Sequence, residues 1–335
     1  MNSFGRLFRI NIFGESHGEC IGIVIDGCPA GIPLTENDLI EKLEKRKSGQ
    51  KGTTARKEED MPKIKSGIFK GKTTGAPIMI LIENMDIDSS KYEKLKDTPR
   101  PGHADFTAFK KFHGFNDYRG GGHFSGRLTA CLVIAGVIAK KLLRGIEINA
   151  KVIEVGGTKD IQKALDKAIA ENDSVGGVVE CRTKNLPIGL GEPFFDSVES
   201  SLSHAAFSIP AIKGIEFGSG FKSAEMQGHE CNDEIINAEG KTKTNNAGGI
   251  NGGITNGNEL IFRVAVKPTS SILREQKTID LKTGKVTEIK IEGRHDSCIA
   301  LRIPVILEAI TAIVFADLKL INDIYQNMPK TKVKK

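Results

Sequence analysis

The stretch TPRPGHAD at 98–105, followed after an aromatic and basic spacer by DYRGGGHFSGR at 117–127, leads directly into an apolar segment at 128–143. That segment is apolar on nearly every side, and a helix of this kind is buried in most directions. We therefore expect a buried helix at the centre of the fold. The three glycines at 120–122 tolerate positive φ, so the backbone before this helix can lie close against a ligand.

The same stretch concentrates basic and titratable side chains, among them His103, His123, Arg100 and Arg127. A glycine-rich turn that opens into a helix presents free N–H groups and the positive end of the helix dipole, which favour anions. A solvated turn would explain three glycines alone. With RPGHAD directly upstream, the pattern instead favours proton transfer on a phosphorylated or carboxylated molecule.

Composition restricts the class of protein and its compartment. The 335 residues include 37 glycines and six cysteines, and the net charge of +6 is spread along the chain. No basic face with interleaved aromatic residues is evident, so we expect no nucleic-acid partner. The cysteines form no C-x-x-C pair, which argues against a zinc site. The N-terminus lacks a signal-peptide core, and the run at 128–139 is shorter than the ~20 residues of a membrane span, so we expect a cytoplasmic protein without membrane contact.

Hydrophobic periodicity predicts an α+β fold. We expect strands at 7–13, 21–25, 78–83, 178–182, 214–217, 260–266 and 288–291, and helices at 35–47, 125–144, 160–172 and 305–324. The first two strands would form a hairpin with Ser16 and His17 at its tip. No solenoid repeat and no Pro/Ser-rich linker divides the chain, so we expect one domain at 1–325 and a basic tail at 326–335.

Polar loops lie between these elements, where binding and catalytic groups are often found. They contain GESHG at 14–18, NNAGGINGG at 245–253, KPTSS at 267–271 and GRHD at 293–296. Each of them alone is typical of a turn, and His17 alone is typical of an exposed turn histidine. The polar segment 49–60 is either a solvated charge run or a loop that closes over an anionic ligand. Together, these loops favour a shared site.

The motifs GESHG, RPGHAD, DYRGGG, NNAGGINGG, KPTSS and GRHD resemble those of the chorismate synthase family, in family order and over nearly the whole chain. The resemblance implies a β-α-β sandwich, in which central helices pack between antiparallel sheets, and a homotetramer. It implies a lyase of the shikimate pathway to aromatic amino acids, which eliminates phosphate from 5-enolpyruvylshikimate 3-phosphate in a 1,4 sense to give chorismate. It also implies a flavoprotein that uses reduced FMN without net redox change, with NADP as an associated cofactor.

The resemblance further implies roles for five catalytic residues. His17 would be the general acid toward the departing phosphate, and His103 would stabilise the reduced, charged flavin on its N1 side. Asp296 would assist proton removal near flavin N5. Ser16 and Ser125 would be relay hydroxyls. Histidine suits such roles because its ordinary pKa of about 6.5 lets it exchange protons near neutral pH.

The resemblance also assigns ligand-binding residues. Arg46 and Lys51 match the basic loop that holds the substrate. The residues that would hold FMN lie in several separate segments: His123, Phe124, Ser125, Pro210, Ala211, Gly252, Lys267, Pro268, Thr269, Ser270, Ser271 and Arg294. No reductase segment is evident, so we expect the flavin to be reduced by an external reductant.

The chain departs from the family pattern at several positions. Lys51 stands where arginine is usual, so bidentate phosphate recognition is lost there although the charge is kept. His123-Phe124 replaces a frequent Arg-Ser pair, Pro210 replaces a common asparagine, and Ser297 replaces a proline. The chain is short between 146 and 178, where we expect altered surface or oligomer contacts. Two other classes remain open: a flavin- or nucleotide-binding protein without this activity, and an anion-binding regulatory module.

Overall fold

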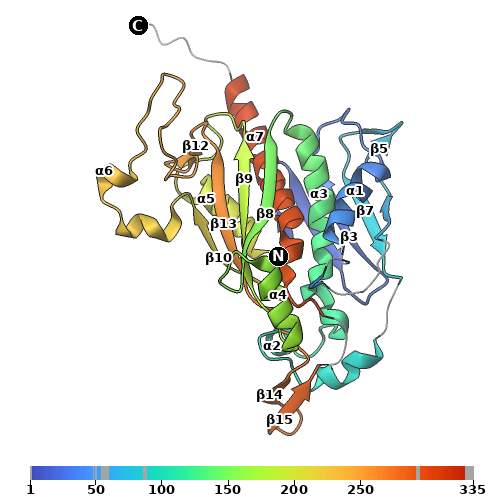
Figure 1. The fold of residues 1–335 in the computed structure, drawn as a ribbon. Helices are drawn as coiled ribbons and strands as arrows, with labels where there is room; N and C mark the ends of the chain where they lie inside the picture. The colour runs from blue at the N-terminus through green and yellow to red at the C-terminus, as the bar shows by residue number, and fades with distance from the viewer. Residues whose placement is uncertain are drawn as a thin grey trace.

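The fold has three layers, with two antiparallel sheets on the outside and helices between them (Figure 1). A computed structural model of the chain describes residues 2–47, 49, 51–53, 60–85, 89–291 and 295–328. The hydrophobic core draws on both sheets and on the helices between them. The fold is therefore α+β, with central helices packed between antiparallel sheets, as the sequence predicts.

The first sheet has five strands in the order β1-β2-β3-β7-β4. The strands are β1 (Ser3–Phe4), β2 (Arg9–Gly14), β3 (Cys20–Asp26), β4 (Pro62–Ile64) and β7 (Ile78–Glu83). β2 and β3 pair antiparallel, so the predicted hairpin is confirmed and Ser16 and His17 lie in its turn. In β7 the residues alternate between buried and less buried, which is typical of a strand with one face on the core.

The second sheet has four strands in the order β10-β13-β9-β8. They are β8 (Glu147–Val155), β9 (Gly177–Lys184), β10 (Ile212–Phe217) and β13 (Leu260–Val266), all paired antiparallel. β13 has the predicted bounds. The nine-residue strand β8 was not predicted, because Glu, Asn and Lys alternate with its apolar residues and weaken its hydrophobic signal.

The middle layer is built on α3 (Thr129–Leu142) and α7 (Ile303–Asn327), which pack against each other. α3 contacts β3 of the first sheet, and α7 contacts β8 and β9 of the second sheet. The two helices approach closely at Gly136, because a Cβ placed there would lie 2.4 Å from the Cβ of Ala309. Ten of the fourteen residues of α3 are buried, which confirms the expected central helix.

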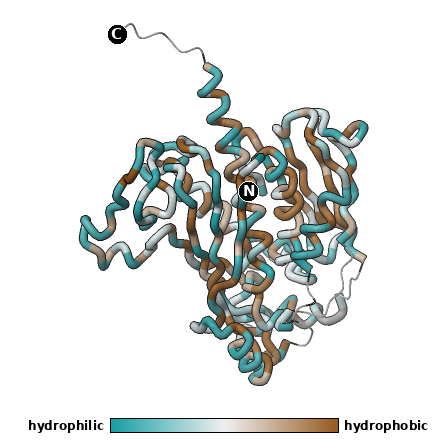
Figure 2. The backbone as a smooth tube through the Cα atoms, turned by 45° about the horizontal axis from the view of Figure 1, so that its top comes forward, coloured by the Kyte–Doolittle hydropathy of each residue, from teal (hydrophilic) through white to brown (hydrophobic). Residues whose placement is uncertain are grey.

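The helical segment Ile299–Asn327, which contains α7, is long and apolar enough to cross a membrane by length and composition. However, 72% of its most apolar window is buried inside the fold. Figure 2 shows hydrophobic segments running through the centre of the molecule and hydrophilic ones along its outer loops. The apolarity of α7 is therefore explained by its place in the core.

The remaining helices surround this middle layer. α1 (Glu36–Arg46) begins after Thr35, whose backbone N–H donates to Asp38 Oδ2 at 2.7 Å, as expected for a capping box. The other helices are α2 (Asp105–Lys111), α4 (Ile161–Ala170), α5 (Val198–Phe207) and α6 (Gly228–Cys231). α5, which contacts both α7 and β10, was not predicted.

Short elements complete the described chain. The hairpins are β5 (Ile68–Phe69) with β6 (Lys72–Thr73), β11 (Ile250–Asn251) with β12 (Ile254–Thr255), and β14 (Glu275–Ile279) with β15 (Val286–Lys290). The 3₁₀ turns are η1 (Ser90–Lys96), η2 (Arg119–Phe124), η3 (Gly126–Leu128), η4 (Phe194–Asp196), η5 (Gly220–Glu225) and η6 (Ile299–Arg302). α2 and the β14–β15 hairpin lie at the lower end of the molecule in Figure 1.

Candidate active site

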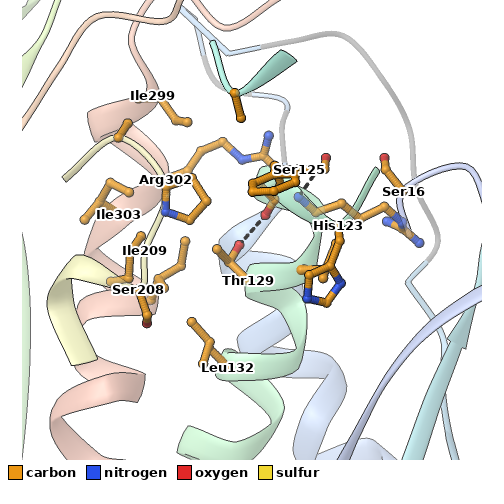
Figure 3. A pocket seen from close by; sticks show the side chains of 18 of the residues that line it. Ser16, His123, Ser125, Thr129, Leu132, Ser208, Ile209, Ile299, Arg302 and Ile303 are labelled. Carbon is orange, nitrogen blue, oxygen red and sulfur yellow. Dashed lines mark hydrogen bonds between the residues drawn. The ribbon is translucent and has the colours of Figure 1, made fainter. Parts of the chain in front are cut away.

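A pocket of about 770 Å³ opens where α3 and α7 begin (Figure 3). Such a volume is typical of sites for small organic ligands. The apolar part of its lining includes Ile10 and Ile12 of β2, Leu132 of α3 and four isoleucines of α7: Ile303, Ile306, Ile310 and Ile313. The rest of the lining, the polar wall, consists mainly of polar and charged residues. Because the first turns of both central helices line the pocket, the positive ends of two helix dipoles face it.

The glycine turn at 120–122 forms part of the pocket wall. The three φ values are 59°, 82° and 53°, which confirms the predicted left-handed backbone. A Cβ placed on Gly120 would lie only 2.2 Å from Cδ2 of His17 and 2.9 Å from Oγ of Ser16. The GESHG loop therefore lies directly against a backbone turn that has positive φ and no side chains. The loops are also joined by a 3.1 Å hydrogen bond from the N–H of Ser16 to the carbonyl of Gly122.

His17 is buried, with only 5% of its surface exposed, so it is not an ordinary exposed turn histidine. Its Nδ1 lies 3.0 Å from Oγ of Ser89, and its ring packs edge-on against Tyr92, with ring centroids 5.0 Å apart. Tyr92, Gly120 and Ser16 line the pocket. His17 itself does not line the pocket, but its ring lies against Gly120, which does.

His103 lines the pocket and belongs to a charged cluster with Asp105 and Arg100. Nδ1 of His103 lies 2.6 Å from Oδ1 of Asp105. Arg100 donates to the two carboxylate oxygens of Asp105 at 2.7 and 2.8 Å, and a further donor of Arg100 reaches Oγ of Ser271 at 3.1 Å. Burial by itself would raise the pKa of Asp105, but the hydrogen bonds from Arg100 and His103 outweigh it and hold that pKa well below its ordinary value.

A second charged cluster lies behind the polar wall. The side chain of Asp60 is fully buried and pairs with Arg46 at 3.2 Å and Arg127 at 2.7 Å. Arg46 also donates to Oγ1 of Thr129 at 3.0 Å and to the carbonyls of Gly126 and Arg127 at 3.0 and 3.1 Å. Arg46 therefore fixes the backbone that leads into α3, in addition to lining the pocket.

Asp296 reaches the pocket from the segment before α7. Its Oδ2 lies 3.3 Å from Nη1 of Arg302, whose Nε donates to the backbone carbonyl of Arg46 at 3.0 Å. The side chain of Asp296 is 10% exposed. Arg302 therefore joins Asp296 to the end of α1, which brings the first and last parts of the chain to the same wall.

The segment 267–271 follows β13 and lies on the polar side of the pocket. Nζ of Lys267 donates to the carbonyl of Gly102 at 2.6 Å and to Oγ of Ser270 at 2.7 Å. Burial, with repulsion from Lys213, lowers the pKa of Lys267. Ala211, which accepts a hydrogen bond from the N–H of Lys267, has a φ of 77°, a conformation that costs strain in a residue with a side chain.

The segment 123–125 supplies another part of the polar wall. His123 lies 2.8 Å from the carbonyl of Gly14 through Nδ1, and since a carbonyl only accepts, this nitrogen carries the proton. Oγ of Ser125 accepts from the N–H of Arg127 at 3.3 Å. Ser16, His123 and Ser125 lie near one another in Figure 3, across from Arg302 and Ile303.

The structure gathers most of the residues singled out from the sequence around one pocket. Those that line it are Ser16, Arg46, His103, His123, Phe124, Ser125, Pro210, Ala211, Lys267, Pro268, Thr269, Ser270, Ser271 and Asp296. Lys51 instead forms an ion pair with Asp166 of α4, and Gly252 lies in the β11–β12 hairpin; neither lines the pocket. Arg294 and most of the predicted lid at 49–60 lie outside the described residues.

Sequence reasoning assigned no role to Asp60, Tyr92 and Asp105. Asp105 could have been singled out from the sequence, because it lies two residues after His103 in the RPGHAD motif. Asp60 gave no signal, since it ends a polar segment with no periodic pattern. Only the folded chain brings it between two arginines.

The chain was compared with protein families and with known proteins. Residues 8–320 match the family model described as chorismate synthase. A chorismate synthase from Chitinophaga pinensis is 63% identical over 332 residues, which cover 98% of this chain and 100% of that relative. A chorismate synthase from Pyrococcus abyssi is 47% identical, over 93% of this chain and 96% of the relative.

A solved structure gives the same result. A chain described as the crystal structure of chorismate synthase superposes with a TM-score of 0.73 at 27% sequence identity. The match covers 95% of this chain and 93% of that chain.

Proposed function

Because this chain belongs to the chorismate synthase family, we propose that the pocket at the start of α3 and α7 is where it performs the family's reaction. The protein is a lyase. It forms chorismate by eliminating phosphate from 5-enolpyruvylshikimate 3-phosphate, in the shikimate pathway to the aromatic amino acids.

One observation supports the site above all others. A single pocket combines an apolar isoleucine wall with a polar wall built from GESHG, RPGHAD, DYRGGG, KPTSS and GRHD, five segments far apart in the sequence. The substrate is a multiply charged anion. Two helix N-termini and the side chains of Arg46, Arg127 and Lys267 give this end of the pocket a positive character that suits it.

The chain's own groups then divide the chemistry between them. His17, at the edge beside Gly120, acts as general acid toward the leaving phosphate, and Ser16 relays its proton. Asp296, held by Arg302, accepts a proton from the substrate. His103, backed by Asp105, balances negative charge that develops within the pocket, with Ser125 as a second relay hydroxyl. Arg46 holds the part of the wall that faces the substrate. Lys51 would reach this part of the wall only if its ion pair with Asp166 were broken.

The described residues fit reduced FMN. A flavin ring has apolar faces and a polar edge, and the lining of this pocket combines isoleucine side chains with polar groups. FMN would be held by 123–125, by Pro210 and Ala211, and by the segment 267–271, with Gly252 and Arg294 as further expected contacts. When bound, reduced FMN would supply an electron-rich partner for the elimination without net redox change.

We further propose the setting in which the enzyme works. It acts in the cytoplasm as a homotetramer and receives reduced flavin from an external reductant, with NADP as the associated cofactor. The burial of α7 in the core supports a protein without membrane contact. We also propose a single domain at 1–325 and a basic tail from residue 326. The helix α7 continues slightly past this boundary, to Asn327.

The test is an anaerobic assay of chorismate formation with reduced FMN, on the wild type and on His17→Ala, His103→Ala and Asp296→Ala. Each variant should lose about two to four orders of magnitude in turnover, the usual effect of removing a positioned acid or base. His229→Ala is the matched control, because His229 is exposed on α6 and does not line the pocket. Near-normal turnover in a variant would show that its residue does not have the proposed role.

A second measurement addresses the cofactor. Flavin absorbance recorded with and without substrate should change on binding of each ligand to the wild type. His229→Ala should bind FMN as the wild type does. If FMN does not bind, or if the elimination proceeds without it, the assignment of reduced FMN is wrong.

A further inference from the structure

We propose that Asp105 is a positioning residue, whose carboxylate holds His103 in the Nδ1–H tautomer and so leaves Nε2 as the nitrogen that acts in the pocket. This inference rests on the proposed role of His103 and deepens it. It concerns the geometry of two side chains of RPGHAD, both in the described part of the chain.

The distance between the two side chains identifies the proton donor. Nδ1 of His103 and Oδ1 of Asp105 are 2.6 Å apart, within hydrogen-bond distance. Nη2 of Arg100 also lies 3.1 Å from Nδ1, but this nitrogen donates to Oδ1 of Asp105 at the shorter distance of 2.8 Å. A carboxylate can only accept, and a bare Nδ1 would place two acceptors 2.6 Å apart, so in this pair the ring nitrogen carries the proton. The reverse arrangement would need a protonated Asp105, and the hydrogen bonds from Arg100 and His103 lower the pKa of Asp105 despite its burial.

Asp105 is itself held rigidly, which a positioning residue requires. Nε of Arg100 donates to Oδ2 at 2.7 Å and Nη2 donates to Oδ1 at 2.8 Å, while the backbone N–H of Arg100 reaches Oδ2 at 3.1 Å. Nη1 of Arg100 is tied to Ser271 at 3.1 Å. The carboxylate therefore receives three hydrogen bonds from one residue, and its Oδ1 also contacts Nδ1 of His103.

The other edge of the imidazole lies beside the glycine turn. Cε1 and Nε2 of His103 lie 3.4 and 3.6 Å from the position a Cβ of Gly121 would take. A side chain at 121 would therefore contact this edge, whereas glycine places no side chain beside it, and His103 itself lines the pocket. The His103 side chain is 21% exposed, compared with 11% for Asp105, so the carboxylate is the more deeply buried partner.

His17 offers an internal contrast. The partner of its Nδ1 is the hydroxyl of Ser89, which both donates and accepts, so that hydrogen bond does not by itself select a tautomer. The partner of His103 is a carboxylate, which does. The two histidines proposed for the reaction are therefore held by partners of different chemistry.

The first test reads the tautomer of the wild-type protein directly. Solid-state 15N NMR on histidine-labelled protein, at about pH 8.5 where an ordinary imidazole is neutral, distinguishes a protonated from a bare ring nitrogen. The His103 signals are identified as those that disappear in His103→Gln. We expect a protonated Nδ1 and a bare Nε2. A protonated Nε2 with a bare Nδ1 would overturn the proposal without any variant having to fold.

The second test uses Asp105→Asn, whose amide group can donate to Nδ1 as well as accept from it. We expect part or all of His103 to switch to the Nε2–H form, and turnover to fall about a hundredfold, at the lower end of what a positioned acid–base group contributes. Glu180→Gln is the control: Glu180 is buried, bonds Arg182 and Arg263 in the second sheet, and does not line the pocket. It should leave the His103 signals and turnover unchanged.

The outcomes separate this inference from the function it rests on. Asp105→Asn protein that keeps the Nδ1–H form would contradict the positioning role. A switched tautomer with normal turnover would support the positioning role and contradict the catalytic role proposed for His103.

Discussion

The carboxylate of Asp60 is completely buried and accepts a 2.7 Å hydrogen bond from Nη1 of Arg127. Its other oxygen accepts from Arg46 at 3.2 Å, so one carboxylate joins the end of α1 to the segment that opens α3. Nε of Arg127 also donates to Oδ1 of Asn84 at 2.6 Å, just beyond β7. Four separate segments of the chain are thus held together at the pocket.

Asp60→Asn should be strongly destabilising, because it removes the negative charge that faces two buried arginines. Breaking a buried ion pair by removing one partner costs about 3–5 kcal/mol. The free energy of unfolding in urea measures the loss. The control is Glu41→Gln, which breaks the exposed pair with Lys45 and should cost less than about 0.5 kcal/mol. Equal stability of the two variants would show that Asp60 is not needed to hold the arginines.

Gly120→Ala should abolish most of the activity although it adds a single methyl group. The new Cβ would lie 2.2 Å from Cδ2 and 2.5 Å from Nε2 of His17, so the imidazole would have to move. Gly145→Ala is the matched control, because Gly145 also has positive φ, at 81°, but no atom lies within 4 Å of its Cβ position. Both variants pay the backbone strain of about 1 kcal/mol. Turnover that falls equally in both would rule out a specific effect on His17.

The stabilising contribution of Asp105 should depend on pH. Its pKa is lowered in the folded protein, so the stabilisation is complete above the unfolded value of about 3.9 and is lost as pH falls through the lower folded value. Asp105→Asn should therefore be less stable than the wild type at pH 7, and the difference should shrink in increasingly acid solution.

Urea unfolding at pH 7 and at about pH 3 measures this difference. Asp26→Asn is the comparison, because Asp26 also pairs with an arginine but its side chain is 40% exposed. Its effect on stability should be smaller at both pH values. A difference for Asp105→Asn that grows toward acid pH would contradict the prediction.

The six cysteines should react in two groups. All six are free thiols. Burial raises the pKa of Cys131 and Cys181 to about 12 and that of Cys28 to about 11. Cys298 is also buried, and its pKa is raised for the same reason. The thiolate is the reactive form, so these four should resist a disulfide reagent at pH 8. Cys20 and Cys231 are partly exposed and should react in the folded protein, Cys20 the more slowly of the two, because burial and the neighbouring Glu19 raise its pKa. Rapid labelling of more than two thiols before denaturant is added would contradict the burial.

Much of the fold follows from local sequence patterns. The strand at Leu260–Val266 and the strand at Ile78–Glu83 were predicted with their observed bounds, because short β-branched and aliphatic runs bounded by polar residues mark strands. The central helix was predicted because a segment apolar on all sides must be buried. The positive φ values at 120–122 were predicted because three glycines in succession tolerate them.

Other elements have no such local signal. β8 alternates charged and amide residues with apolar ones, and it becomes a strand through pairing along the edge of β9. α5 is held by contacts with α7 and β10, which the sequence does not reveal. The burial of His17 is also a tertiary result, because Tyr92, Ser89 and Gly120 cover it from distant positions.

The sequence by itself determined the family and the reaction and predicted most of the residues that line the pocket, because these follow from short motifs whose residue types and order are directly readable. Tertiary structure decided which of those residues meet. It placed Ser16, His103, Ser125 and Asp296 at one pocket, and it turned Lys51 toward Asp166. It also put Asp60 between two arginines. The physical reason is that ion pairs and shared walls depend on distances of a few ångströms between residues far apart in the chain, and only the packing of α3 against α7 between two sheets sets those distances.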